Sequence, residues 1–284
     1  MTDVSSYYNW IDPASRNIAT LYAQDLWDIR NGLRATFGAR YDDYSDFGSS
    51  INPRAGISWQ ISPTLGSRFT YGSAYRAPSF VEQHVKNNPV SLGNPDLKSE
   101  KIDTMEANLS WKNDWSQLET TLFYSNIDQF IDTPTSSIQY QNLGHIHVRG
   151  MEIEGHYHLQ GGPLLNANYS FADPDFSGRE PLTRVARHHL NLAADIPLPA
   201  NLHWNIHGLW HSAIPRSNND PRSARAAVWV VNTALSGQWG PWALRAAVFN
   251  LTNADNASTA PPGSLVDDYP APGRSLAVDV RYEF

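Results

Sequence analysis

Apolar and polar residues alternate one by one along most of this chain. The last segment shows the pattern clearly, because every second position is large and apolar: Leu276, Val278, Val280, Tyr282 and Phe284. Successive side chains of a β-strand point to opposite faces, so a period of two predicts strands with one apolar and one polar face. Helical periodicity is not apparent anywhere. The chain is therefore expected to be all-β.

Thirteen segments carry this alternation. They are residues 17–27, 32–42, 51–61, 65–76, 101–112, 117–131, 140–159, 164–172, 184–196, 202–211, 227–238, 241–252 and 274–284. The connections between them alternate between short turns and long polar loops. The long loops are expected at 43–50, 77–100, 172–183, 212–226 and 253–273. Long loops at one end and short turns at the other are typical of an antiparallel transmembrane β-barrel, with the long loops outside the cell.

Composition excludes several other classes of protein. A membrane-spanning helix needs about 20 apolar residues, whereas one of the longest apolar runs is Ala226 to Val231. The absence of cysteine excludes disulfides and thiolate metal sites. A net charge of −7 without a basic run argues against nucleic acid as a partner. The first ten residues do not read as a signal peptide, so an exported protein would have its true N-terminus further upstream.

A large soluble all-β protein, such as a propeller or solenoid, is the alternative fold. Each of its strands would then present a band of aliphatic and aromatic side chains to water, which soluble monomers rarely do. The membrane barrel is the favoured interpretation.

Short motifs along the chain resemble those of TonB-dependent outer-membrane receptors. The segment from Thr70 to Ser79, TYGSAYRAPS, is followed by GNPDLKSE from Gly93 to Glu100, and both resemble the family's strand-end and loop motifs. Tyr75 stands where the family usually has Phe, and Ser99 where Pro is common. Further pieces follow in the family's order, at residues 21–25, 38–42, 50–54, 149–154, 250–253 and 282–284.

The resemblance implies a 22-stranded barrel around an N-terminal plug. Counting back thirteen strands from Phe284 makes residues 1–284 the C-terminal part of that barrel, with residues 1–16 in an extracellular loop. The plug, the segment that contacts TonB and nine strands are then expected to be absent from this sequence. Because single-chain bacterial barrels use even strand numbers, thirteen strands alone are not expected to close.

The resemblance also implies a function. Receptors of this kind bind a scarce ligand outside the cell and import it with energy passed through TonB, so the expected role is uptake of a ferric siderophore across the outer membrane. A haem receptor is the second interpretation, and a non-functional barrel remnant without a plug is the third.

The expected partners are the transported ligand, outer-membrane lipid and the barrel-assembly machinery, with TonB reached only through the plug. No cofactor is expected. The sequence has no phosphate-binding glycine loop, G-x-S-x-G or H-E-x-x-H motif, so an enzyme is not expected.

Six residues are candidates for ligand binding. His84 lies between the two loop motifs, where haem receptors of the family carry an axial-ligand histidine, although their histidine usually stands further from the proline. The other candidates are Glu82, Arg76, Trp10, Arg216 and Arg222. Aromatic rings and guanidinium groups suit an anionic siderophore. A surface histidine and ordinary loop packing are the alternative explanations.

Histidines and glutamates of the polar strand faces could suggest a metal site. The six expected inside are His156, His158, His189, His203, His207 and His211. Residues four apart on a strand are separated by about 13 Å, so His203, His207 and His211 cannot share one ion. A solvated polar wall explains these histidines, as well as Glu152 and Glu154, and no metal site is predicted.

The end of the chain carries a different signal. Tyr282 and the terminal Phe284 close an alternating strand. This ending resembles the signal that the barrel-assembly machinery reads.

Overall fold

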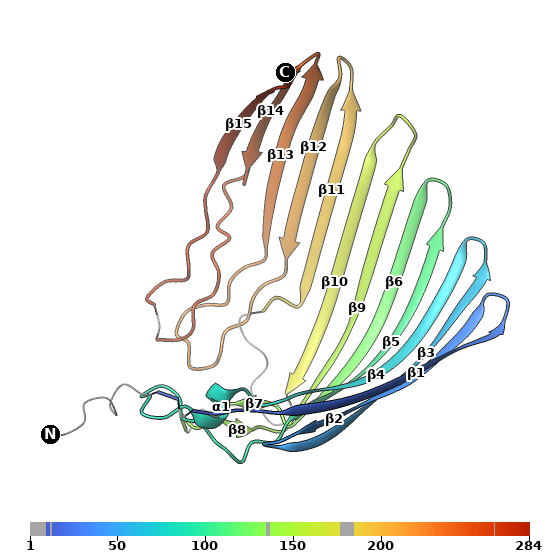
Figure 1. Cartoon of the computed structure of the whole chain (residues 1–284). Coiled ribbons are helices and arrows are strands. Elements are labelled where there is room, and N and C mark those ends of the chain that lie inside the picture. Colours follow the sequence, from blue (N-terminus) through green and yellow to red (C-terminus); the bar gives the residue numbers. More distant parts are fainter. Residues whose placement is uncertain (1–9, 12, 135–136, 177–184, 264) are drawn as a thin grey trace.

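The computed structural model describes residues 10–11, 13–134, 137–176, 185–263 and 265–284. Within them the chain forms one antiparallel sheet of thirteen strands, as predicted (Figure 1). The strands are β1 (Ile18–Arg30), β2 (Leu33–Tyr44), β3 (Gly48–Ser62), β4 (Leu65–Arg76), β5 (Glu100–Lys112), β6 (Ser116–Asp128), β9 (His145–His158), β10 (Leu164–Phe176), β11 (His188–Leu198), β12 (Leu202–His211), β13 (Val228–Trp239), β14 (Trp242–Phe249) and β15 (Ser275–Tyr282). Three small elements stand outside this sheet: α1 (Phe80–His84) and the pair β7 (Ile131–Asp132) and β8 (Gln141–Asn142).

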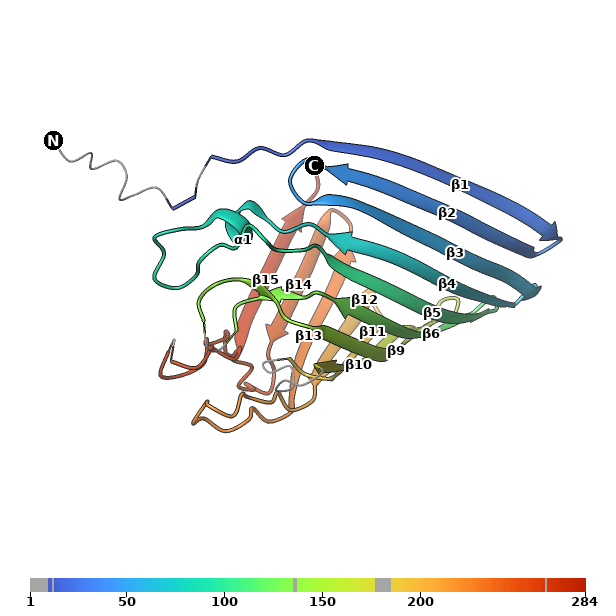
Figure 2. The same ribbon diagram turned by 90° about the horizontal axis from the view of Figure 1, so that it is seen from below.

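The sheet is strongly curved and open. Each strand pairs with the next strand of the sheet, and β1 and β15 form its two edges. Figures 1 and 2 show it as a trough, with the long connections gathered at one end and the short turns at the other. No helix among the described residues is long and apolar enough to cross a membrane.

The pairing register keeps like faces together across the sheet. One polar row runs across five strands as Thr121, Glu152, Ser170, His189 and His211. A neighbouring apolar row runs as Thr120, Ile153, Tyr169, Leu190, Trp210 and Trp229. A shift by one residue would exchange the faces of a strand, so this register is strongly specified.

The apolar face is left uncovered. On β15, Leu276 is 71%, Val278 65% and Val280 61% exposed. Large aliphatic side chains at such exposure fit contact with lipid hydrocarbon, and the polar residues line the opposite face of the trough.

Two strands predicted from the alternation are too long. The segment 117–131 ends earlier in the structure, because β6 ends at Asp128, and the segment 140–159 begins later, because β9 begins at His145. Gln129 and Gly144 have φ angles of 59° and 90°, which turn the chain out of the sheet. Residues 129–134 and 137–144 are therefore parts of a long loop that contains the β7–β8 pair.

The prediction of a long loop at 43–50 is also wrong. Tyr44 of β2 pairs with Gly48 of β3, so only three residues join these strands. Gly48 adopts a φ of 96°, which glycine reaches at little cost. By contrast, β10 extends to Phe176, past the predicted end at 172. The start of the predicted strand 184–196 and residues 177–183 of the loop before it lie outside the described residues, as do residues 1–9 and 12 of the predicted N-terminal loop.

Helix α1 is not anticipated by the alternation. Ser79 Oγ accepts a hydrogen bond from the Glu82 N–H (3.2 Å), and the Glu82 carboxylate accepts one from the Ser79 N–H (2.7 Å). This reciprocal capping box starts the helix. Five residues are too few to show helical periodicity in a sequence.

Candidate functional site

Loops at one end of the sheet form two packed clusters. The first loop cluster consists of residues 10–11, 13–16, 45–47, 77–99, 129–134 and 137–144. Leu97, Ile131 and Val85 are buried within it at 3%, 5% and 6% exposure. Backbone hydrogen bonds join its parts, for example from Leu92 N to Ile138 O (2.7 Å). These loops therefore pack around a small apolar core of their own, outside the sheet and next to the strand ends.

Residues of the two loop motifs hold this cluster together. The Asn94 side chain donates to Tyr140 O (3.0 Å) and accepts from Asp96 N (3.0 Å). The side chain of Asn142 donates to Lys98 O (2.9 Å), and Pro78 is fully buried. These contacts fix the shape of the loops from within.

Arg76 and Glu82, two of the sequence-predicted ligand residues, bind each other. The Arg76 guanidinium lies 2.9 Å from one Glu82 oxygen and 3.0 Å from the other, and its Nε lies 2.6 Å from Glu100. Glu100 also accepts from Ile131 N (2.7 Å), which ties β4, α1 and the 129–144 loop together. Burial acts to raise the pKa of Glu82, but its hydrogen bonds with Arg76 and Ser79 outweigh this and hold that pKa below its ordinary value.

Sequence reasoning missed Arg16, which joins three separate segments. Its guanidinium binds Asp46 (2.7 Å) and donates to Pro78 O and Gln83 Oε1, both at 2.9 Å. It also lies over the rings of Phe47 (4.9 Å) and Phe80 (5.0 Å). Its partners are 30 to 67 residues away, so no local pattern could have revealed it.

His84 and Trp10 lie on the same cluster, His84 half-buried and Trp10 exposed. The His84 ring stacks on Phe80 with centroids 6.3 Å apart and makes no hydrogen bond to any described residue. Trp10 is 54% exposed, and its carbonyl oxygen accepts from Lys86 N (2.9 Å). Both remain candidates for ligand contact.

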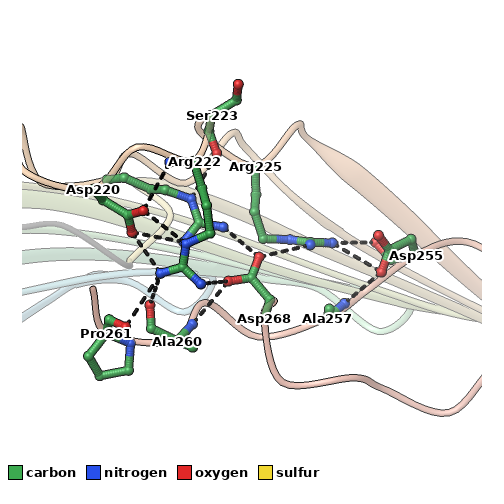
Figure 3. A network of polar contacts seen from close by, with 10 residues as sticks. Asp220, Arg222, Ser223, Arg225, Asp255, Ala257, Ala260, Pro261 and Asp268 are labelled. Atoms are coloured by element: carbon green, nitrogen blue, oxygen red, sulfur yellow. Dashed lines mark hydrogen bonds and ion pairs between the residues drawn. The ribbon is translucent and has the colours of Figure 1, made fainter. Parts of the chain in front are cut away.

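The second loop cluster consists of residues 212–227, 250–263 and 265–274 and is organised around Asp268 (Figure 3). This carboxylate is 8% exposed and lies 2.5 Å from Arg216, 3.1 Å from Arg225 and 3.4 Å from Arg222. It also accepts from the backbone N–H of Ala260 (3.1 Å). One buried side chain therefore joins the two loops.

Asp220 and Asp255 complete the network around Asp268. Asp220 is 2% exposed and binds Arg222 (2.8 Å) and Arg216 (3.3 Å), while Asp255 binds Arg225 (3.2 Å). Three arginines thus face three aspartates, and their formal charges cancel.

The arginines lower the pKa values of the two buried aspartates. The hydrogen bond from Arg216, opposed by burial, brings the pKa of Asp268 down to about 2. The hydrogen bond from Arg222 holds the pKa of Asp220 far below its ordinary value. Arg216 and Arg222, predicted to grip an anionic ligand, have guanidinium groups that are already engaged by these carboxylates.

The polar face below the loops contains hollows. One of about 540 Å³ is lined by residues of both charges, among them Asp28, Arg34, Arg68, Lys112 and Glu119. Several of the histidines expected on this face bind polar neighbours, for example His203 with Asp195 (2.8 Å). The described residues contain no group of three or more His, Asp and Glu side chains that could hold a metal ion.

The aromatic end of the chain lies at the opposite rim. Tyr282 packs edge-on against Trp242 and Phe284, with ring centroids 4.9 and 5.0 Å apart. Phe284 itself is fully exposed. Nothing in these contacts tests the predicted role in assembly.

Long tilted strands, an apolar outer face, a polar inner face and loops at one end define a segment of an outer-membrane β-barrel. The TonB dependent receptor-like β-barrel family matches residues 2–251, and the chain belongs to this family. It is an outer-membrane protein. Members of this family are receptors and transporters.

Relatives of known function share part of this chain. The vitamin B12 transporter BtuB of Vibrio cholerae is 27% identical over 150 residues, which cover 52% of this chain and 24% of the transporter. The heme/hemopexin utilization protein C of Haemophilus influenzae is 23% identical over 289 residues, which cover 86% of this chain and 40% of that protein. The chain thus spans less than half the length of these relatives.

Solved structures show the same fold. The siderophore receptor PirA from Acinetobacter baumannii superposes with a TM-score of 0.78 at 16% identity. The ferric enterobactin receptor PfeA from Pseudomonas aeruginosa gives 0.80 at 18% identity. Each comparison covers 95% of this chain and 46% of the other protein.

Proposed function

We propose that this chain forms the extracellular loops and most of the barrel wall of a TonB-dependent receptor that imports a ferric siderophore, and that it catalyses no reaction. The observation that carries the proposal is the pair of loop clusters, each internally cross-linked, at one end of a polar wall. A binding surface that is already ordered loses little conformational entropy when a ligand arrives.

The proposed ligand surface is the accessible part of the first loop cluster. The exposed Trp10 ring can stack on an aromatic group of a ligand, and PirA and PfeA are siderophore receptors by name. The His84 ring, stacked on Phe80, lies on the same cluster. Arg216 and Arg222 act by holding the shape of the second cluster. The remaining partners in this proposal are a plug and TonB for energy, lipid on the apolar face and the barrel-assembly machinery at Phe284.

Uptake in a host strain tests the proposal. The strain lacks its own copy of the receptor and expresses the whole receptor that contains this chain; the probe is radiolabelled ferric enterobactin. We expect uptake that disappears in a TonB-deficient strain. Absence of uptake of this probe, haem and cobalamin, with the barrel present in the outer membrane, would favour the non-functional remnant.

Haem is the second candidate, and the His84 imidazole is the observation that favours it. Its ring nitrogens make no hydrogen bond to any described residue and are available to bind iron. If haem is the ligand, His84→Ala abolishes growth on haem as the sole iron source, whereas His203→Ala, which removes a histidine paired with Asp195, leaves it unchanged. Unchanged growth of the His84→Ala strain would contradict this role.

A further inference from the structure

A single carboxylate interrupts the apolar face of the sheet on β1. The residues of β1 on this face are Ala19, Leu21, Ala23, Asp25, Trp27 and Ile29. Leu21 is 71% exposed and Trp27 62%, so large apolar side chains stand on both sides of Asp25 along the strand. Across the strands, Asp25 is in register with Phe37 of β2, which pairs in turn with Ala55 of β3. Asp25 therefore lies within the band that faces lipid hydrocarbon.

Asp25 is also set apart by its position along the strand. The other charged residues and histidines of the apolar face lie on β2, β5, β6, β9, β10 and β11, in the half of each strand nearest the loop clusters. There Arg149, for example, binds Asp173 (2.9 Å). Among the described strands, Asp25 alone places a charge in the half nearest the short turns. Contact with the outer headgroups explains the first group but not Asp25.

Asp25 has no partner among the described residues. Its side chain is exposed and makes no hydrogen bond or ion pair with any of them. Asp28, on the polar face of the same strand, lies by contrast 2.7 Å from Arg34. An ionised carboxylate is costly in hydrocarbon unless a cation or a hydrogen-bond donor accompanies it. A carboxylate at this depth thus calls for a partner from outside the described sheet.

The free edge of β1 is the side from which that partner can come. Figure 2 shows β1 at the rim of the trough, with β2 as its one neighbour in the sheet. The chain spans less than half the length of its relatives, and a barrel that is stable in lipid needs a strand beside this edge. Such a flanking strand places one side chain of its lipid face opposite Asp25, with Cβ atoms about 4.5–5.5 Å apart. A long cationic side chain at that position can reach the carboxylate directly.

We propose that Asp25 forms an ion pair with a lysine or arginine of the strand that flanks β1 in the whole receptor. The apolar stem of either side chain can lie along the lipid face while its charged group meets the carboxylate. The pair also fixes the register of the two strands, because a shift by one residue would turn the cation to the polar face. It further disfavours closure of β1 on β15, whose apolar face offers Leu276, Val278 and Val280 and no cation. The pairing concerns assembly of the barrel and does not depend on which ligand the receptor transports.

Replacement of Asp25 by leucine tests the ion pair, because the sign of the effect depends on what Asp25 faces. The whole receptor is purified from host outer membranes, and the temperature at which its folded, heat-modifiable gel band disappears is measured. With a cation opposite, Asp25→Leu and Asp25→Asn leave that cation uncompensated, and we expect this temperature to fall by at least about 3 °C. With lipid alone opposite, Asp25→Leu would remove a charge from hydrocarbon and raise the temperature.

Two control variants lie on the same strand. Ala23→Leu introduces the same side chain on the same face. Asp28→Asn removes a carboxylate from the polar face, where its ion pair with Arg34 is exposed. Neither should lower the transition temperature by more than about 1 °C.

Disulfide mapping identifies the residue opposite Asp25. The chain has no cysteine, so Asp25→Cys is combined with single cysteines placed one at a time along the flanking strand of the whole receptor. We expect a cross-link within one receptor molecule, at a position that lysine or arginine naturally occupies. A transition temperature raised by Asp25→Leu, a cross-linked position with any other natural residue, or a cross-link to a second copy of the receptor would overturn the proposal.

Discussion

At Asp268 a single carboxylate accepts hydrogen bonds from three arginines of another loop and from a backbone N–H. Such a buried group is stable only while its partners remain, because removing one side of a buried pair leaves the other charge uncompensated. The chemical type of Arg216 and Arg222 was apparent from the sequence. Their partner, 46 to 52 residues away, was not.

Asp268→Asn should open the second loop cluster. The amide keeps the shape of the side chain but removes the one negative charge that all three arginines share, so we expect trypsin to cleave after Arg222 and Arg225 at least about tenfold faster. The control is Asp279→Asn, because Asp279 is exposed and lies 3.6 Å from its arginine, a geometry worth about 0–1 kcal/mol. Equal cleavage rates for Asp268→Asn and the wild type would refute the central role of Asp268.

Acid should loosen the same cluster. The pKa of Asp268 is depressed to about 2 in the folded state, so its contribution to stability is complete above the ordinary aspartate value of about 4 and is lost as the pH falls toward 2. Amide hydrogen exchange of residues 250–274, corrected for its intrinsic pH dependence, should be constant from about pH 5 to 8 and accelerate below about pH 4. Loosening that begins near pH 6 would point to a histidine instead.

Among the elements, the sheet strands follow from the sequence because a period of two is readable within one strand. The prediction fails where the structure depends on distant contacts. Ile131 is buried outside the sheet, and backbone hydrogen bonds join Ile138 and Tyr140 to Leu92 of the 77–99 loop. Helix α1 is fixed by a capping box that spans four residues. For the candidate site, the sequence predicted only which types of residue lie in the loops. Their contacts could not be predicted, because they form between loops that are far apart in the sequence.

Gly150 of β9 tests the packing between neighbouring strands. A methyl group there would overlap the ring of Phe123 and the carbonyl oxygen of Phe171, and the backbone oxygen cannot move aside. Gly150→Ala should therefore cost about 1–3 kcal/mol and reduce the amount of folded protein in outer membranes. Gly155→Ala on the same strand, where the nearest atom lies 3.9 Å away, should be tolerated, and equal yields of the two variants would contradict this account.

For the molecule as a whole, the open sheet leaves both edges and the apolar face without a protein partner among the described residues. Backbone groups at such edges are costly in lipid, so a stable barrel requires further strands beside β1 and β15. The exposed aromatic end of the chain is available to a protein that guides this assembly.

Deletion of Phe284 should impair insertion into the outer membrane. Phe284→Ser is expected to behave like the deletion, whereas Phe284→Tyr keeps an aromatic ring and should insert normally. Immunoblots of outer-membrane fractions with an antibody to residues 253–273 measure the outcome. Normal insertion of the deletion variant would show that the aromatic ring is not the signal.

The cancelled charges of the second loop cluster also affect how fast a ligand can arrive. Opposite charges a few ångströms apart produce a field that fades within a short distance, so this part of the rim exerts little long-range pull on an approaching anion. Capture there would depend on random encounter and fit, and the association rate would change little between dilute and concentrated salt.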